Sequence, residues 1–406
     1  MGNSMTNDAP LPLSGLRVIE FTHMVMGPSA GVILGDLGAD VIKVEPVEGD
    51  HTRRLVGSGA GYFPMYNRNK RSIALNLKDP KGLSVARKLI AGADIMIENF
   101  RPGAVDRLGL GYDTVQADNP GLIYCSAKGF LDGPYAHRTA LDEVAQMMGG
   151  LAYMTGPPGR PLRAGSSVID VMGGMFGVIG ILAALEERHR TGRGQCVTSS
   201  LFESTVFLVG QHMAQYAVTG KAANPMPVRI SAWAIYDVFE TSDEDAVFVG
   251  VVSDSQWVKF CDLFGLADYA GDDSLATNAA RVARRDEIIP RVRALFKSFT
   301  KTALMEKLEH SGLPFAPIAK PQDMFDDPHL GASGGLVDVS LPNGGGTQGK
   351  TSLPALPLAM DGRRCTVRHD LRASGQDSRD ILKSLGLSQA ECDALIDDGI
   401  VVQYDE

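Results

Sequence analysis

The sequence predicts an α/β protein with a large domain built on a parallel sheet and a second, smaller α+β domain. The chain has 406 residues, which exceeds the usual size of a single hydrophobic core. Apolar segments of strand length alternate with helical segments through its first half, a pattern typical of a parallel sheet covered by helices on both faces. Beyond residue 220 the pattern changes to a hairpin and a series of amphipathic helices.

Each element of the first half is predicted from local signals. Residues 16–22 (LRVIEFT) form a strand, and Gly27-Pro28 then begins a helix that ends at Leu37-Gly38. The strand at 41–45 completes a first strand–helix–strand unit. The elements expected next are a helix at 79–91, strands at 95–99 and 122–130, helices at 139–151 and 168–190, a strand within 191–200 and a helix from 201.

The second half predicts a smaller domain and then a return to the first. Residues 234–253 form a hairpin whose turn lies at 243–245, and amphipathic helices follow at 255–264, 284–299 and 301–311. After residue 330, short strands and a helix at 387–399 are expected to rejoin the large domain. We therefore place the large domain at 1–205 and 330–406, the small domain at 225–325, and linkers at 206–224 and 326–335.

Composition argues against several classes of function. The formal charge of −9 argues against nucleic acid as a partner, because phosphates need a basic face. The five cysteines show no CxxC pair and the eight histidines no HExxH motif, so we expect a reduced, cytoplasmic protein without a metal or a permanently bound cofactor. The basic residues of 67–71 (NRNKR), with Arg101 and Arg107, are candidates for binding an anionic ligand or for a solvated surface.

Three common motifs do not fit their usual chemistry. Residues 27–31 (GPSAG) match a hydrolase nucleophile elbow, but too little chain precedes them for the oxyanion-hole loop that an elbow needs. Residues 344–351 match a phosphate-binding loop, but prolines at 354 and 357 argue against the helix it requires, and a glycine-rich hairpin is expected instead. The first strand–helix unit lacks GxGxxG, which argues against a nicotinamide cofactor.

Residues 168–185 (VIDVMGGMFGVIGILAAL) hold one acid, Asp170, in an otherwise apolar run. We expect a buried core helix and no membrane span, because the run is marginal in length for a bilayer and no second span accompanies it. Burial raises the pKa of a carboxylate and removes the water that blunts its nucleophilicity. Asp170 is therefore either a nucleophile that attacks an activated acyl group or an ordinary first-turn acid of a helix.

Four segments, in order, resemble one family of enzymes. They are residues 13–46 (LSGLRVIEFTHMVMGPSAGVILGDLGADVIKVEP), 67–82 (NRNKRSIALNLKDPKG), 93–113 (ADIMIENFRPGAVDRLGLGYD) and 182–195 (LAALEERHRTGRGQ). Together they resemble the class III CoA-transferases, the group that includes formyl-CoA:oxalate transferase and the carnitine and bile-acid enzymes. The resemblance implies a Rossmann-like large domain built from both ends of the chain, a smaller domain between them, and a homodimer of two interlocked rings.

The resemblance also implies a covalent mechanism with a coenzyme A thioester as substrate. In this family the aspartate that matches Asp170 attacks a donor acyl-CoA, forms an aspartyl anhydride, and then becomes an aspartyl-CoA thioester that passes CoA to an acceptor acid. Gly173 and Gly174 are expected to allow close approach to the developing oxyanion. The matching CoA-binding positions are His23, Leu75, Lys78, Asn99, Phe100, Arg101 and Arg107. Leu75 and Phe100 are equally compatible with plain core packing.

Two departures from the family pattern bear on the acceptor. Val25 stands where formyl-CoA:oxalate transferase has a glutamine, and residues 224–239 (NPMPVRISAWAIYDVF) replace its glycine-rich loop. We therefore expect succinyl-CoA as donor and a small dicarboxylic acid or a sulfinate analogue, rather than oxalate, as acceptor. Arg229 is a candidate for the distal acid group or an interdomain structural residue. Asp142 and Glu143 either position the acceptor, tune Asp170 or are simply solvated.

Two other functions are compatible with the sequence. The α-methylacyl-CoA racemases share the architecture and need a histidine opposite the acid; His137 is the candidate here, although its spacing is imperfect. A non-catalytic CoA-binding subunit is the alternative from a different class. The intact Asp170 in its glycine-rich setting argues against such a subunit.

Overall fold

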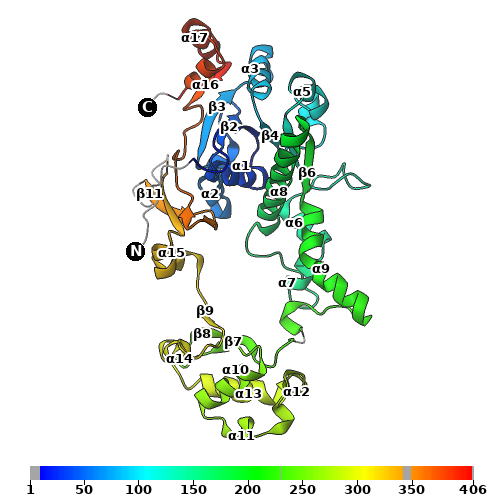
Figure 1. Ribbon diagram of the computed structural model, residues 1–406, viewed down its shortest axis with the longest axis vertical. Helices are drawn as coiled ribbons and strands as arrows, with labels where there is room; N and C mark the ends of the chain where they lie inside the picture. Colours follow the sequence, from blue (N-terminus) through cyan, green and yellow to red (C-terminus); the bar gives the residue numbers. More distant parts are fainter. Residues whose placement is uncertain (1–9, 230, 342–348, 405–406) are drawn as a thin grey trace. The chain divides into compact units, whose positions relative to one another are not determined.

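The computed structural model describes residues 10–229, 231–341 and 349–404. The chain divides into two compact units, and Figure 1 traces it through both of them. Unit 1 comprises residues 1–227 and 328–406, and unit 2 comprises residues 228–327. Unit 2 is therefore inserted into the chain of unit 1. The sequence places the small domain at 225–325, and the structure sets the bounds of unit 2 at 228 and 327.

Within the residues that the structure describes, unit 1 is built on a seven-stranded sheet in the order β14-β3-β2-β1-β4-β5-β6. Its strands are β1 (Arg17–Phe21), β2 (Asp40–Glu45), β3 (Lys70–Leu75), β4 (Ile95–Glu98), β5 (Ile123–Lys128), β6 (Cys196–Ser200) and β14 (Val401–Val402). Neighbouring strands are parallel, except that β14 is antiparallel to β3. The chain runs outward from β1 to β3 and then crosses to β4, so the strand order reverses between β1 and β4. Ligands of such sheets bind at this reversal, beyond the carboxyl ends of the strands.

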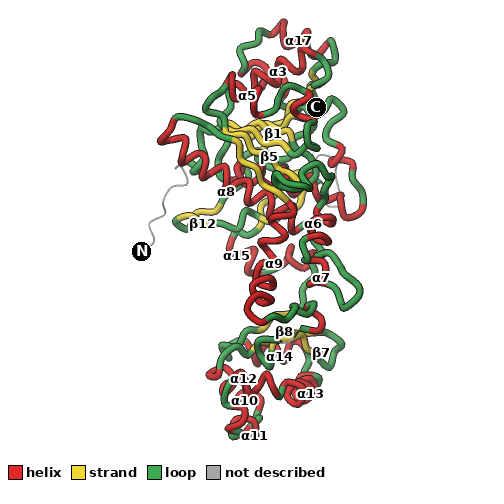
Figure 2. Tube along the Cα trace, turned by 90° about the vertical axis from the view of Figure 1, so that its right-hand side faces the viewer, coloured by secondary structure: helices red, strands yellow, loops and turns green. Residues whose placement is uncertain are grey.

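Helices cover both faces of this sheet. The helices of unit 1 are α1 (Met26–Asp36), α2 (Tyr62–Tyr66), α3 (Pro80–Ala91), α4 (Ala104–Arg107), α5 (Tyr112–Asp118), α6 (Asp142–Met148), α7 (Leu151–Thr155), α8 (Val168–Thr191), α9 (Leu201–Thr219), α15 (Pro328–Ser333), α16 (Ser378–Ser384) and α17 (Gln389–Asp397), with short 3-10 turns at His51–Arg54 and Gly57–Gly61. Successive strand residues point to opposite faces. In β1, Val18 therefore packs with α1 and α8, whereas Ile19 and Phe21 pack with α3, α16 and α17. Figure 2 shows the yellow strands between α3 and α5 on one side and α8 on the other.

Three predicted segments differ from the structure. The helix predicted at 139–151 is divided into α6 and α7, because Gly150 adopts the left-handed conformation (φ 88°) between them. Most of the predicted linker 206–224 belongs to α9, whose apolar sequence continues to a left-handed cap at Gly220. The predicted linker 326–335 likewise contains α15.

Unit 2 has its own antiparallel sheet and its own core. Strands β7 (Tyr236–Glu240) and β8 (Ala246–Gly250) form the predicted hairpin, and β9 (Phe315–Pro317) pairs with β8. Its helices are α10 (Asp254–Phe264), α11 (Ala267–Ala270), α12 (Asn278–Ala283), α13 (Arg285–Phe296) and α14 (Lys301–Leu308), with 3-10 turns at Asp273–Leu275 and Pro321–Asp326. A further 3-10 turn, Met226–Val228, lies where the chain passes from unit 1 into unit 2. Phe239, Phe260 and Phe296 lie edge to face at the centre of its core.

The motifs at 27–31 and 344–351 have structural roles. Ser29 is buried within α1, and its hydroxyl donates to the carbonyl oxygen of Met26 (2.7 Å). Part of the second motif, residues 344–348, lies outside the described residues. Its Lys350 and Thr351 belong to strand β11 (Lys350–Pro354), which pairs with β10 (Leu336–Ser340), rather than to the helix that a phosphate-binding loop requires. A further short hairpin joins β12 (Ala359–Met360) to β13 (Arg363–Arg364).

Helices α1 and α8 cross at very short range because two glycines of α8 face α1. A Cβ atom at Gly173 would lie 2.6 Å from Cε of Met26, and one at Gly174 would lie 2.0 Å from Oγ of Ser29 and 2.6 Å from the carbonyl oxygen of Met26. A side chain at 174 would force the two helices apart, whereas one at 173 would displace the flexible end of Met26. The glycines therefore bring the first turns of α8 to the start of α1.

Helix α8 is covered on one face only within the described structure. Ile169, Val178 and Ile181 are buried. Met175 and Ile179 are about half exposed, and Leu182 is 39% exposed. By length and composition alone α8 is apolar enough to cross a membrane, although such a test is also passed by core helices of soluble proteins. The prediction of a buried core helix therefore holds for the face that packs against α1 and the sheet, but not for the opposite face.

A matched pair of glycine substitutions tests this crossing. Gly174→Ala places a methyl group against the main chain of α1, so we expect the free energy of unfolding to fall by about 1–3 kcal/mol. Gly210→Ala in α9 meets nothing within 4 Å and should stabilise the protein by about 0.5–1 kcal/mol, because alanine favours a helix interior. Urea denaturation of the two variants measures both effects. Equal stabilities for the two variants would show that α1 and α8 do not depend on the glycine.

Candidate active site

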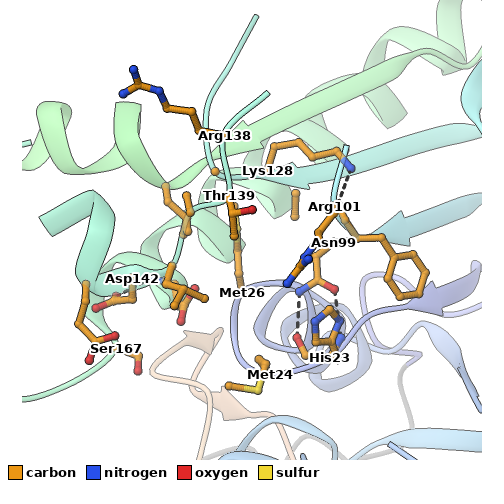
Figure 3. A pocket seen from close by; sticks show the side chains of 18 of the residues that line it. His23, Met24, Met26, Asn99, Arg101, Lys128, Arg138, Thr139, Asp142 and Ser167 are labelled. Carbon is orange, nitrogen blue, oxygen red and sulfur yellow. Dashed lines mark hydrogen bonds between the residues drawn. The ribbon is translucent and has the colours of Figure 1, made fainter. Parts of the chain in front are cut away.

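A cavity of about 350 Å³ lies beyond the carboxyl ends of β1, β4, β5 and β6, where the strand order reverses. His23 and Met24 follow β1, Asn99 and Phe100 follow β4, and Lys128 ends β5. The loop before α6 and the start of α8 complete the lining. In Figure 3, Asp142 and Ser167 lie on one side of the cavity, and His23 and Asn99 lie on the other.

Asp170 lies in the first turn of α8 and lines this cavity. Its side chain is partly buried, and burial raises the pKa of its carboxyl group to about 7, with a further contribution from the neighbouring carboxylate of Asp142. Arg163 opposes this increase, whereas Glu143 adds to it. Within the described residues the Asp170 carboxylate has no hydrogen-bond partner of its own. It is therefore a carboxylate held near the midpoint of its titration at neutral pH and available to a ligand in the cavity.

Asp142 fixes the segment that carries Asp170. Its Oδ2 atom accepts hydrogen bonds from the main-chain amides of Ile169 (2.9 Å) and Asp170 (3.1 Å) at the start of α8. Its Oδ1 atom accepts from Gln146 and lies 3.4 Å from the guanidinium of Arg163. Asp142 is buried, so it is not one of two solvated acids on a helix face; Glu143 is the more exposed one and pairs with Arg163 (2.6 Å). Of the roles considered for Asp142, the tuning of Asp170 is supported by this geometry.

The opposite wall of the cavity is held by Asn99. Its Oδ1 accepts from the main-chain amide of His23 (3.0 Å), and its Nδ2 donates to the carbonyl oxygen of the same residue (2.9 Å). The imidazole of His23 stacks on Phe100 with ring centres 5.9 Å apart. Burial lowers the pKa of His23, so its ring is neutral at pH 7, and its buried Nδ1 has no hydrogen-bond partner among the described residues. Lys128 donates to the carbonyl oxygen of Phe100 (3.0 Å) and holds the end of β4 in place.

A buried network of charges supports the loop between β1 and α1. Lys43 donates to the carbonyl oxygen of Thr22 (2.8 Å) and pairs with Asp50 (3.0 Å). Lys70 donates to Glu20 (2.9 Å) and to the carbonyl oxygen of Pro28 (3.0 Å). The loop between these carbonyls contains Met24, whose backbone is left-handed (φ 63°) and whose amide donates to Thr52 Oγ1 (3.1 Å). Two buried lysine side chains therefore hold the chain on both sides of Met24, at Thr22 and in the first turn of α1.

The basic segment 67–71 does not serve an anionic ligand. Arg68 pairs with Asp36 (2.6 Å), Lys70 with Glu20, and Arg71 with Asp40 (2.6 Å). Arg68 and Lys70 are buried, so the segment is neither a ligand-binding cluster nor a solvated surface. Its charges pair with acids in strands and helices distant in sequence, and no local pattern in 67–71 shows that.

The structure brings together seven of the predicted site residues. Those that line the cavity are His23, Asn99, Phe100, Arg101, Asp142, Glu143 and Asp170. Arg101 is exposed, as is Arg138 at the same cavity, and these two cations suit the phosphates of an anionic ligand. Within the described residues no group of three His, Cys, Asp or Glu side chains is arranged to hold a metal ion.

The remaining predicted residues lie outside the cavity lining. Leu75 is buried in the core at the end of β3, Lys78 is exposed just beyond it, Arg107 is exposed at the end of α4, Val25 is buried before α1, Arg229 is exposed in unit 2, and His137 is exposed in the loop before α6. Gly173 and Gly174 face α1 rather than the cavity, and their amides lie inside a helix. These glycines thus allow the close approach of helix α1. Their role in stabilising an oxyanion stays a prediction.

Sequence reasoning gave no chemical role to three residues that line the cavity with Asp170: Tyr62, Arg163 and Ser167. One signal for Ser167 is present in the sequence. Its spacing from Asp170 (Ser-x-x-Asp) is that of a helix N-cap and the third residue of the helix, two positions whose side chains lie next to each other. Tyr62 and Arg163 carry no such local signal; Tyr62 comes from α2, and Arg163 from the loop before α8.

Replacing Asp170 by Asn tests the raised pKa. The folded-state value of about 7 lies above the ordinary aspartate value of 3.8 expected for the unfolded chain. Between these values the folded wild type retains a proton that the unfolded chain has released, so wild-type stability falls as the pH rises through this range and levels off above it. We expect the stability of Asp170→Asn relative to the wild type to grow from about pH 4 to pH 7, measured by urea denaturation. A difference independent of pH would contradict the raised pKa.

Comparison with known proteins identifies a family for the chain. The chain matches CoA-transferase family III over residues 13–378. It is 33% identical to succinyl-CoA:glutarate CoA-transferase of Mus musculus, over 98% of this chain and 92% of the relative. It is 36% identical to succinate–glutarate CoA-transferase of Agrobacterium fabrum, over 84% of this chain and 88% of the relative. A solved CAIB/BAIF family protein from Brucella suis is similar with a TM-score of 0.81 and 34% identity, covering 93% of this chain and 100% of the other. The resemblance carried by the four sequence segments is confirmed: the chain belongs to CoA-transferase family III.

Proposed function

We propose that the protein transfers CoA from succinyl-CoA to a small dicarboxylic acid of about the size of glutarate. The single observation that carries the proposal is Asp170, a carboxylate of raised pKa at the wall of a cavity where the strand order of the sheet reverses. The names of the two relatives, which pair succinate or succinyl-CoA with glutarate, support the choice of substrates. Arg101 and Arg138 supply positive charge for an anionic thioester at the same cavity.

In the proposed mechanism the Asp170 carboxylate attacks the thioester carbonyl of succinyl-CoA. The C–S bond breaks, CoA leaves as a thiolate, and a mixed anhydride of Asp170 and succinate forms. The thiolate then attacks the Asp170 carbonyl, which releases succinate and leaves an aspartyl-CoA thioester. The acceptor carboxylate attacks the same carbonyl, expels the thiolate and forms a second anhydride. Attack of the thiolate on the acceptor carbonyl of that anhydride yields the acceptor-CoA product and restores the Asp170 carboxylate.

The surroundings of Asp170 suit this chemistry. A carboxylate with a pKa near 7 is a stronger nucleophile than an ordinary aspartate and is still substantially ionised at neutral pH. Limited access of water protects an anhydride from hydrolysis. We propose that His23, Asn99, Phe100 and Arg101 contact CoA within the cavity, and that Lys78 and Arg107 extend its binding site along the same edge of the sheet.

The geometry excludes His137, the histidine that the sequence offers for a racemase, although a different histidine, His23, lines the cavity. Proton transfer at the α-carbon of an acyl-CoA requires a histidine that faces the acid across the substrate. His137 is exposed and does not line the cavity, which His23 lines instead. A non-catalytic subunit would have no need for the raised pKa of Asp170.

Trapping of the covalent intermediate tests the proposal. After incubation with succinyl-CoA, hydroxylamine or borohydride should modify the peptide that contains Asp170, as read by mass spectrometry. Asp170→Ala should lose both this modification and CoA transfer to glutarate. Asp113→Ala, which removes an exposed acid on α5, serves as the control and should retain both. An unmodified wild type that exchanges deuterium into the α-carbon of an acyl-CoA would establish the racemase instead.

We further propose that the protein is a homodimer of interlocked chains. Exposed apolar side chains on α8 and α9, including Met175, Ile179, Phe207, Met213 and Tyr216, form a surface that costs free energy when it faces water. Met175 and Ile179 are four residues apart on one face of α8, so they form a continuous stripe. A second copy of the chain would cover this stripe, as the resemblance to interlocked family members implies.

A pair of charge substitutions tests the dimer. Phe207 on α9 is 72% exposed and Val258 on α10 is 52% exposed, so an aspartate at either position costs little within one folded chain. We expect the wild type to have about twice the 43.3 kDa mass of one chain in light scattering. Phe207→Asp should lower the melting temperature or the dimer fraction, whereas Val258→Asp should leave both unchanged. A monomeric wild type would exclude the interlocked assembly.

A further inference from the structure

Helix α8 begins with a serine that does not cap it. Ser167 is the residue that precedes the helix, and a serine there normally accepts a hydrogen bond from the amide of the second or third helical residue. These two amides belong to Ile169 and Asp170, and both donate to Oδ2 of Asp142 instead. The side chain of Ser167 makes no cap hydrogen bond. Asp142, from another helix, thus performs the task that the local sequence assigns to Ser167.

Because Asp142 caps the helix, the side chains of Ser167 and Asp170 are both left without a capping hydrogen bond. In a Ser-x-x-acid capping arrangement the serine hydroxyl and the acid would both be engaged with main-chain amides at the start of the helix. Here Ser167 and Asp170 have that spacing, yet neither side chain is used in this way. The hydroxyl of Ser167 is buried and lies 3.4 Å from Oη of Tyr62. Ser167, Tyr62 and Asp170 all line the same cavity.

We infer that Ser167 is a catalytic hydrogen-bond donor to the acyl group formed on Asp170. This inference rests on the proposed covalent mechanism and adds a residue to it. When CoA thiolate or an acceptor carboxylate attacks the Asp170 carbonyl, negative charge develops on the oxygen that remains attached to Asp170. The Ser167 hydroxyl donates to that oxygen, and the Tyr62 hydroxyl donates to Oγ of Ser167. No proton is transferred; the two hydrogen bonds stabilise the charge until the carbonyl re-forms and the leaving group departs.

Asp142 acts as a positioning residue in this arrangement. Because it holds both amides, the start of α8 keeps its conformation whether or not Ser167 has a hydroxyl. A donor that is fixed before the reaction contributes more than one that must first be released from a cap. Side chains at the N-cap and at the third helical position are neighbours on the first turn, so Ser167 needs no backbone movement to approach the Asp170 acyl group.

Ser167→Ala tests this role, with Ser166→Ala as the matched control because Ser166 is exposed and does not line the cavity. We expect Ser167→Ala to lower kcat about 100-fold, with a much smaller change in the KM for succinyl-CoA and an unchanged melting temperature. The steps that slow are those in which the Asp170 carbonyl is attacked. A larger fraction of the enzyme should therefore be trapped as the Asp170 adduct at steady state. Ser167→Thr, which keeps a hydroxyl, should recover most of kcat, and Ser166→Ala should match the wild type.

Two outcomes would overturn the inference. A kcat for Ser167→Ala close to that of the wild type would show that the hydroxyl does not act on the acyl group. A lower kcat that is accompanied by a lower melting temperature, without accumulation of the adduct, would show that Ser167 is a structural cap. If the wild type itself forms no adduct on Asp170, the proposed covalent mechanism fails, and this result is distinguishable because it does not involve the variant.

Discussion

The close crossing of α1 and α8 is the constraint on which the site depends. Asp170 comes from α8, whereas His23 and Met24 come from the loop that leads into α1, and the two elements are far apart in sequence. Glycine at 173 and 174 removes the side chains that would separate the helices. The distance from Asp170 to the opposite wall of the cavity therefore depends on the contact between α1 and α8, which the two glycines permit. A larger residue at 174 would shift the nucleophile away from the opposite wall, and one at 173 would displace Met26, which lines the cavity.

The loop on the opposite wall depends on a different kind of interaction. Lys43 and Lys70 are buried with Glu20, and their ammonium groups also bind the carbonyl oxygens of Thr22 at the start of the loop and of Pro28 in the first turn of α1. Buried ion pairs contribute little net free energy, because desolvation offsets the attraction, but removal of one partner leaves an uncompensated charge and is strongly destabilising. The network therefore stabilises one conformation of the loop over others that would break a buried ion pair. The left-handed backbone of Met24 persists because its surroundings are fixed in this way.

Much of the fold follows from sequence patterns, and the limits of those patterns have clear causes. The parallel strands, the hairpin of unit 2 and the helix that carries Asp170 are predictable because each depends on the periodicity of a single segment. The role of Asp142 is beyond local patterns, because its hydrogen bonds to Ile169 and Asp170 join residues almost thirty positions apart. The charges of 67–71 suggest a ligand-binding or solvated segment for the same reason: the acids that they pair with lie in other strands and helices. Gly149-Gly150, in contrast, is a local break signal that favours division of the helix predicted at 139–151.

The pairing of β14 with β3 has a consequence for synthesis of the chain. Val401 and Val402 complete the sheet at its β3 edge, where Leu75 and Ala74 would otherwise present unpaired main-chain groups. The ribosome adds β14 long after β3, the strand that it must join. During that interval, unit 2 emerges as a continuous segment with a core of its own, while the sheet of unit 1 keeps an open edge. Aggregation of the nascent chain should therefore concentrate at β3, and loss of Val401 and Val402 should harm folding yield more than their small contribution to the core suggests.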